Sequence, residues 1–149
     1  MEPTNEKAVE LLNDLLEKNY DAEKGYKKAA EDTKASSLKE FCRDYASQRY
    51  NFGHEIKDEI RRLGGEPDKG TSVAGNLHRT WIDIKTALSS DKDESVVEEC
   101  IRGERAALED YEDVLGNSAL PSSSRELVQR QHDQIQSAMN RLNQIERTL

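Results

Sequence analysis

The sequence predicts an all-α protein that folds as a four-helix bundle with one long crossover connection, and three observations support this fold class. Apolar residues recur every three or four positions along most of the 149 residues, which is the spacing that places them on one face of an α-helix. No segment shows the alternation of apolar and polar residues that is typical of a β-strand. Two helix-length segments joined by a short turn are followed by about thirty residues and then by two more such segments, the order expected of a bundle with one crossover.

Two bundle helices are expected in the first part of the chain, at about 5–33 and about 38–63. The apolar positions of the first helix form one continuous stripe. Its members are Leu12, Leu15, Leu16, Asn19, Ala22, Tyr26, Ala29 and Ala30. The second helix begins near Ser37 and Glu40, which have the spacing of a capping box, in which each side chain bonds a free backbone N–H group. The glycines at 64–65 are expected to end it.

Two more bundle helices are expected at about 94–115 and about 123–148. Gly116 closes the first of them, because glycine is the usual residue after a helix end. Ser123 and Glu126 repeat the capping-box spacing at the start of the second. The apolar positions of this last helix are three and four residues apart in turn, as in the seam of a helical bundle.

A shorter apolar pattern at about 72–88 predicts a crossover helix between the second and third bundle helices, with Trp81 as its anchor. In this arrangement the second and third bundle helices run parallel, so the connection has to travel the length of the bundle. A chain of this size is expected to form one domain, residues 1–149.

The formal net charge of −8 narrows the expected partners. Nucleic-acid binding requires clustered Lys and Arg, and an anionic membrane surface attracts positive charge, so neither partner is expected. No stretch approaches the ~20 apolar residues of a membrane span, and the N-terminus lacks the features of a signal peptide. Cys42 and Cys100 are not part of a Cys-x-x-Cys pair and fall on apolar helix faces, which predicts buried free thiols in a reducing cytoplasm.

Each bundle helix carries a polar residue near the middle of its apolar stripe. In chain order these residues are Asn19, then Gln48 or Arg49, then Glu104, then Gln131 or His132. A polar group inside a bundle destabilises the fold unless it is paired, so four at one level indicate a site or the remnant of one. The first and third helices also share a phrase, Asn19-x-x-Ala22-x-x-x-Tyr26 and Glu104-x-x-Ala107-x-x-x-Tyr111.

Two interpretations of this polar layer remain open. A di-metal centre in a bundle uses about four carboxylates and two histidines, with Glu-x-x-His on two of the helices. The layer offers only Glu104 and His132 as such ligands, and the sequence contains no Glu-x-x-His. The other interpretation is a hydrogen-bonded layer in which the guanidinium of Arg49 neutralises Glu104 in the place of a metal. We favour this second interpretation and predict that Glu104 is buried and paired with Arg49.

Several longer motifs carry a resemblance to a known family. They are Gly25-Tyr26-x-x-Ala29-Ala30, Leu63-Gly64-Gly65-Glu66-Pro67, Leu77-His78-Arg79-x-Trp81-Ile82-Asp83-Ile84-Lys85, and Arg102-Gly103-Glu104 leading to Asp110-Tyr111-Glu112. Through them the chain resembles, over nearly its whole length, an uncharacterised bacterial family of ferritin-like four-helix bundles, a domain of unknown function. The resemblance implies a fold similar to rubrerythrin and bacterioferritin, whose members bind di-iron and reduce peroxide or oxidise iron. It also implies a bacterial, cytoplasmic setting and a stress-related role.

The resemblance transfers few of the metal ligands. Only Glu104 and His132 fall on positions that match the ligand pattern of rubrerythrin and bacterioferritin, whereas Asn19, Gln48, Asn51 and Gln129 depart from it. The leading hypothesis is therefore a non-enzymatic, metal-free bundle protein with a degenerate site, no cofactor, and a homodimer rather than a closed cage as its assembly. The alternative is an oxidoreductase or iron-handling protein that binds iron or manganese through an unusual, carboxylate-poor site.

Overall fold

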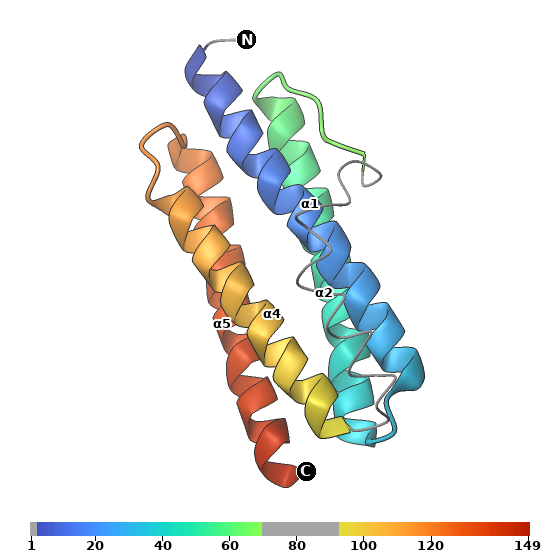
Figure 1. The fold of residues 1–149 in the computed structure, drawn as a ribbon. Coiled ribbons are helices and arrows are strands. Elements are labelled where there is room, and N and C mark those ends of the chain that lie inside the picture. The colour runs from blue at the N-terminus through green and yellow to red at the C-terminus, as the bar shows by residue number, and fades with distance from the viewer. Residues whose placement is uncertain (1–2, 70–92) are drawn as a thin grey trace.

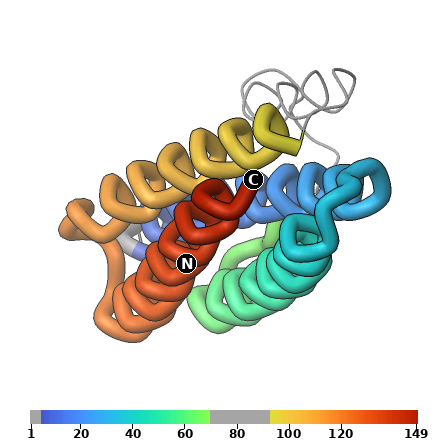
Figure 2. Tube along the Cα trace, turned by 90° about the horizontal axis from the view of Figure 1, so that it is seen from below, coloured from blue at the N-terminus to red at the C-terminus, as the bar shows by residue number. Residues whose placement is uncertain are grey.

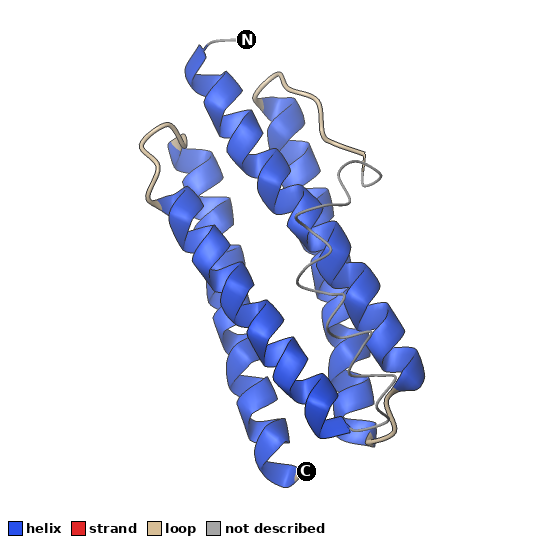
Figure 3. Ribbon diagram, in the orientation of Figure 1, coloured by secondary structure: helices blue, strands red, loops and turns tan. Residues whose placement is uncertain are grey.

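The computed structural model describes residues 3–69 and 93–149, and these residues form four helices and no strand (Figures 1 and 3). They are α1 (Pro3–Asp32), α2 (Ser36–Arg62), α4 (Asp93–Leu115) and α5 (Ser122–Thr148). The all-α prediction is confirmed over these ranges, and each helix boundary lies within two residues of its expected position. The expected crossover helix, with Trp81, lies outside the described residues.

The helices are arranged as two antiparallel hairpins, α1 with α2 and α4 with α5, which lie side by side (Figure 2). Across the two hairpins α1 also packs against α4, and α2 against α5. As Figure 1 shows, α2 and α4 run in the same direction, as the sequence predicts. The end of α2 and the start of α4 therefore lie at opposite ends of the bundle.

Hydrogen bonds at the two ends of the bundle fix this order. The Asp93 carboxylate, at the first residue of α4, accepts hydrogen bonds from the backbone N–H groups of Lys34 and Ala35, at 3.2 and 2.7 Å. The start of α4 is therefore held beside the turn between α1 and α2. At the other end, the Asn5 side chain donates to the carbonyl of Leu63 at 3.5 Å, so the end of α2 lies beside the start of α1.

A single hydrophobic core runs between the hairpins and draws side chains from all four helices. Fully buried members include Leu12, Leu16, Phe41, Ile56, Ile60, Val97, Val128, Ile135 and Leu142. Burial of each such side chain stabilises the fold by about 1.5–3 kcal/mol relative to its exposure to water. The predicted stripes thus meet in the interior.

Neither predicted capping box forms, because each helix begins one residue before the serine that was expected to cap it. The residue before α2 is Ala35, and its N–H is bound by Asp93 rather than by a capping side chain. The residue before α5 is Pro121, and it likewise carries no side-chain cap. The hydroxyl groups of Ser123 and Ser124 instead donate to the carboxylate of Glu59 on α2, at 3.0 and 2.5 Å. These serines therefore join the two hairpins instead of capping a helix.

The turn after α2 depends on its two glycines, as expected. Gly64 has a φ of 88°, in the left-handed region that glycine adopts without strain. A Cβ at Gly65 would lie 2.6 Å from a methyl group of Val9, so only glycine lets this turn approach α1 so closely. The glycines therefore both end α2 and seat the following turn against the first helix.

Candidate functional site

The centre of the bundle is occupied by an ion pair between Arg49 on α2 and Glu104 on α4. The two guanidinium Nη atoms of Arg49 donate to the two carboxylate oxygens of Glu104, at 2.8 and 2.5 Å. The side chain of Arg49 is 1% exposed and that of Glu104 is 0% exposed. The predicted pair is confirmed. Its two parallel hydrogen bonds are the strongest arrangement available to these groups, and they fix the orientation of both side chains.

Aromatic rings surround the cation of this pair. The guanidinium carbon of Arg49 lies 5.8 Å from the ring centre of Tyr26 and 5.8 Å from that of Phe52. A guanidinium at this distance is attracted by the face of an aromatic ring. Burial by itself lowers the pKa of Arg49, but the attraction and hydrogen bonds of Glu104 outweigh burial and raise that pKa above its usual value. Arg49 therefore stays positively charged in the core.

A second chain of hydrogen bonds crosses the bundle through Tyr111. The Asn19 amide on α1 donates to the Tyr111 hydroxyl at 2.9 Å, and this hydroxyl donates to the Gln131 side-chain oxygen at 2.7 Å. The Gln131 amide in turn donates to the carbonyl of Phe52 at 3.2 Å and to the Glu55 carboxylate at 3.0 Å. Each amide side chain in the layer is thus bonded to a neighbouring helix, which offsets the cost of its burial.

The shared phrase on α1 and α4 explains why these groups meet. Asn19, at the start of the phrase on α1, bonds Tyr111, at the end of the phrase on α4. Tyr26, at the end of the phrase on α1, lies in the field of Glu104, at the start of the phrase on α4. Burial first, and then the charge of Glu104, raise the pKa of Tyr26 well above its usual value. Burial is also the main cause of the raised pKa of Tyr111. Both phenols remain protonated at neutral pH.

The structure shows which of the alternative residues lie in the buried layer. On the last helix Gln131 is fully buried and faces the layer, whereas His132 lies outside it, with 15% of its side chain exposed. The His132 ring nitrogens lie 2.9 Å from Glu112 on α4 and 3.1 Å from the neighbouring Asp133. Successive helical positions point about 100° apart, so only one of the two could face the centre. The assignment of His132 to the layer is therefore wrong.

On α2 the residue that faces the buried layer is Arg49. Arg49 is buried, whereas Gln48 is half-buried at the edge of the layer. The side-chain oxygen of Gln48 accepts a hydrogen bond from Nε of Arg49 at 3.3 Å. Gln48 therefore touches the central pair from outside. Of the six residues proposed for the layer, four lie in the buried centre: Asn19, Arg49, Glu104 and Gln131.

The central residues do not fit a di-metal centre. Both oxygens of Glu104, the one buried carboxylate among the residues whose burial is described, are bound by a permanently charged guanidinium. A cation placed there would meet Arg49 as a like charge. Within residues 3–69 and 93–149, no group of three or more His, Cys, Asp or Glu side chains is placed to hold a metal ion. The donor set therefore favours the hydrogen-bonded interpretation of the layer.

Two members of the network were not identified from the sequence. Tyr111 connects Asn19 to Gln131, and Glu55 connects Gln131 to Arg130, which donates to the Glu55 carboxylate at 2.9 Å. The repeated phrase, which ends in a tyrosine in both helices, was the signal for Tyr111. No comparable signal existed for Glu55, because it lies at the edge of the stripe of α2.

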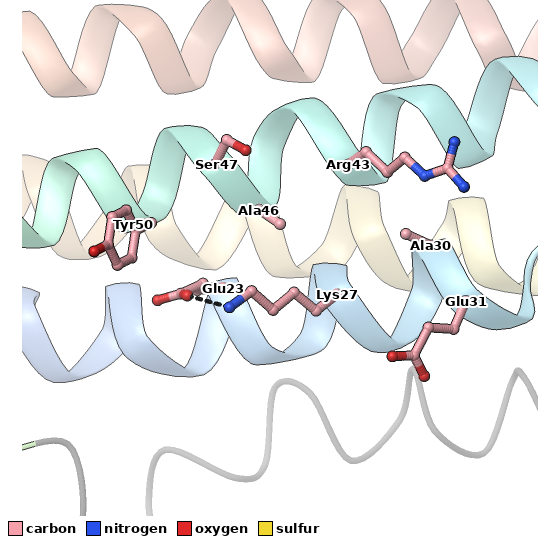
Figure 4. Close-up of a pocket in the computed structure, with 8 residues that line it drawn as sticks. All are labelled: Glu23, Lys27, Ala30, Glu31, Arg43, Ala46, Ser47 and Tyr50. Atoms are coloured by element: carbon pink, nitrogen blue, oxygen red, sulfur yellow. Dashed lines mark ion pairs between the residues drawn. The ribbon is translucent and has the colours of Figure 1, made fainter.

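The surface carries a groove of about 520 Å³ between α1 and α2 (Figure 4). Ala30 and Ala46 line it with small buried side chains. Along α1 the ion pair of Glu23 and Lys27 borders the groove, with 2.7 Å between the charged atoms. On α2 the groove is bordered by Tyr50, whose side chain is 51% exposed, the highest value among the described large hydrophobic residues. The groove therefore combines charged, aromatic and small residues in a position open to solvent.

Replacement of Arg49 tests the importance of the central pair. Arg49→Met leaves the Glu104 carboxylate buried without its counter-ion, and we expect a loss of about 3–5 kcal/mol in the free energy of unfolding. The double variant Arg49→Met/Glu104→Leu removes both charges and should recover much of this loss. Urea denaturation followed by circular dichroism measures these differences. Arg61→Met, on the exposed face of α2, is the matched control and should change stability by less than about 0.5 kcal/mol. Equal effects at Arg49 and Arg61 would contradict the assignment.

The contact between His132 on α5 and Glu112 on α4 is expected to stabilise the fold in a pH-dependent way. Partial burial opposes protonation of His132, but the hydrogen bonds to Glu112 and Asp133 outweigh it and raise its pKa from the usual value. Because the folded-state pKa is the higher one, this stabilisation is complete below the unfolded pKa of about 6.5 and is lost as the pH rises through the folded value.

Thermal melts of the wild type and of His132→Gln, measured across this pH range, test the contact. The wild type should have the higher Tm at acidic pH, and the difference should shrink towards alkaline pH. Glu112→Gln should reduce the same difference. A Tm difference that is independent of pH would show that His132 does not act through its charge.

No helix in the described part of the chain has the length and apolar character that a membrane span requires.

Comparison with known proteins gives the family but no described activity. A search of curated proteins finds no match. Residues 7–117 match the family described as "Domain of unknown function (DUF2383)". Because this match covers well over half of the chain, the protein belongs to the DUF2383 family.

Proposed function

We propose that this protein is a non-enzymatic, metal-free bundle with a ferritin-like fold, which acts through contacts with other molecules. The observation that carries the proposal is the bidentate ion pair of Arg49 and Glu104 at the centre of the bundle. In a di-metal bundle this space holds cations that carboxylates neutralise. Here a side-chain cation neutralises the carboxylate instead, so the centre stabilises the fold without a metal.

The order and direction of the described helices support a ferritin-like fold. The parallel course of α2 and α4, with the start of α4 beside the turn between α1 and α2, is the arrangement that a bundle with one long crossover requires. The motif resemblance adds a bacterial, cytoplasmic setting and a stress-related role to the proposal. We also propose that the protein associates with a second copy of itself as a homodimer.

The groove between α1 and α2 supports a role in molecular contacts. It exposes the ring of Tyr50 at one end and the guanidinium of Arg43 at the other (Figure 4), and the structure shows no ion-pair partner for Arg43 among the described residues. Tyr and Arg are the residue types that contribute most to binding at protein surfaces. The small side chains of Ala30 and Ala46 between them leave room for a ligand side chain.

Metal analysis tests the proposal. The untagged protein is purified without chelators from cells grown with added iron and manganese, and its metal content is measured by elemental mass spectrometry. We expect far less than one metal ion per chain. Addition of ferrous iron or manganous ions to the purified protein should leave its Tm unchanged, because only a ligand bound to the folded state raises it.

Two alanine variants define the contrary outcome. Glu104→Ala removes the buried carboxylate, and Glu112→Ala removes a surface carboxylate as the matched control. Stoichiometric iron or manganese in the wild type that is lost in Glu104→Ala and kept in Glu112→Ala would overturn the metal-free proposal. It would favour the alternative of a carboxylate-poor di-metal protein.

A further inference from the structure

The fold brings together the two cysteines of the chain, which are 58 positions apart in the sequence. Cys42 lies on α2 and Cys100 on α4, so they belong to different hairpins. Both side chains are 0% exposed and both thiols are free. The neighbouring Cys42 thiol raises the pKa of the Cys100 thiol well above its usual value, so the two thiols lie near each other. The sequence predicted two separate buried thiols, whereas the structure places them near each other.

The register of α2 and α4 explains this pairing independently. The hydrogen bond between Ala35 and Asp93 holds the starts of these two parallel helices together, at 2.7 Å. Cys42 follows Ala35 by seven residues, and Cys100 follows Asp93 by seven residues. Seven residues are about two helical turns, or roughly 10 Å. The two cysteines therefore lie at the same level, on the buried faces of their helices.

The next contact in the same direction keeps the helices together beyond the cysteines. It is the Arg49–Glu104 pair, one to two turns further along both helices. The thiols are thus placed between two hydrogen-bonded contacts that join α2 to α4. Bond formation requires the two sulfur atoms to approach each other to about 2 Å, and the register of the helices already places both side chains at one level.

We propose that Cys42 and Cys100 are a redox-active dithiol that closes to an intramolecular disulfide and joins the two hairpins covalently. The oxidant is a small-molecule disulfide such as glutathione disulfide. The thiolate of one cysteine attacks this disulfide, forms a mixed disulfide and releases one glutathione thiolate. The thiolate of the other cysteine then attacks the mixed disulfide, forms the protein disulfide and releases the second. Two electrons leave the protein, two glutathione molecules are formed, and the two thiol protons are transferred to them.

The surroundings of the pair set the rate of this exchange. The neighbouring Cys42 thiol, followed by burial, raises the pKa of the Cys100 thiol well above its usual value, and the charge of Glu104 adds to this effect. Only the thiolate attacks, so exchange is slow and accelerates with pH. The oxidant also has to reach the interior through local opening of the bundle. The position of the equilibrium does not depend on this rate.

The test equilibrates the folded wild-type chain anaerobically with reduced glutathione and glutathione disulfide at equal concentrations. The samples are then quenched in acid and analysed by intact mass spectrometry and by thiol titration in denaturant. We expect a monomer that has lost two hydrogen atoms and both titratable thiols. The oxidised protein should have a Tm higher by on the order of 10 °C, because the cross-link closes a long loop of the unfolded chain. The approach to equilibrium should be faster at higher pH.

Single variants provide the controls. Cys42→Ala and Cys100→Ala should each retain one thiol or carry one glutathione, with no gain in Tm, and their circular dichroism shows whether they fold. Three results in the wild type would overturn the proposal: two thiols that stay reduced at equilibrium, only glutathione adducts or intermolecular dimers, or an oxidised protein with a lower Tm. The first two mean that the thiols do not pair, and the third means that the bridge strains the fold.

Discussion

The structure depends on one constraint, which is that the charged side chains of Arg49 and Glu104 are buried together between the two hairpins. Removal of two charges from water is unfavourable, and only close, hydrogen-bonded pairing compensates for it. The bidentate contact provides this pairing, and it exists only when α2 and α4 have the relative height seen here. The ion pair therefore favours one register of the hairpins over others with equally apolar stripes.

The remaining polar contacts fit this register. Asp93 holds the start of α4 at the turn between α1 and α2, and Tyr111 connects Asn19 to Gln131 across the centre. At the surface, the hydroxyl groups of Ser123 and Ser124 bond the Glu59 carboxylate. The same register places Cys42 and Cys100 at one level, on the buried faces of their helices. The pairing of the hairpins thus neutralises the buried charges of the centre and sets the level of both cysteines.

The sequence predicted the helices and the central pair well, and the reasons are physical. Helical periodicity gave the stripes, and the rule that a buried charge needs a partner selected Arg49 for Glu104. The sequence could not show whether Gln131 or His132 faces the layer, because adjacent helical positions differ only in the direction of their side chains. Both capping boxes were wrong, since α2 and α5 begin at Ser36 and Ser122, one residue before the serines expected to cap them. The thiol pair was missed because its geometry arises from the parallel register of α2 and α4.

The most direct measurement of the central claim is nuclear magnetic resonance of the Arg49 guanidinium in protein labelled with ¹⁵N-arginine. A buried bidentate pair restricts rotation of the guanidinium and protects its protons from water. We expect one arginine with separate Nη proton signals that exchange slowly with solvent, and we expect Arg49→Lys to remove these signals. If every arginine guanidinium rotates freely and exchanges rapidly with water, Arg49 is not held by Glu104, and the account of the bundle centre is wrong.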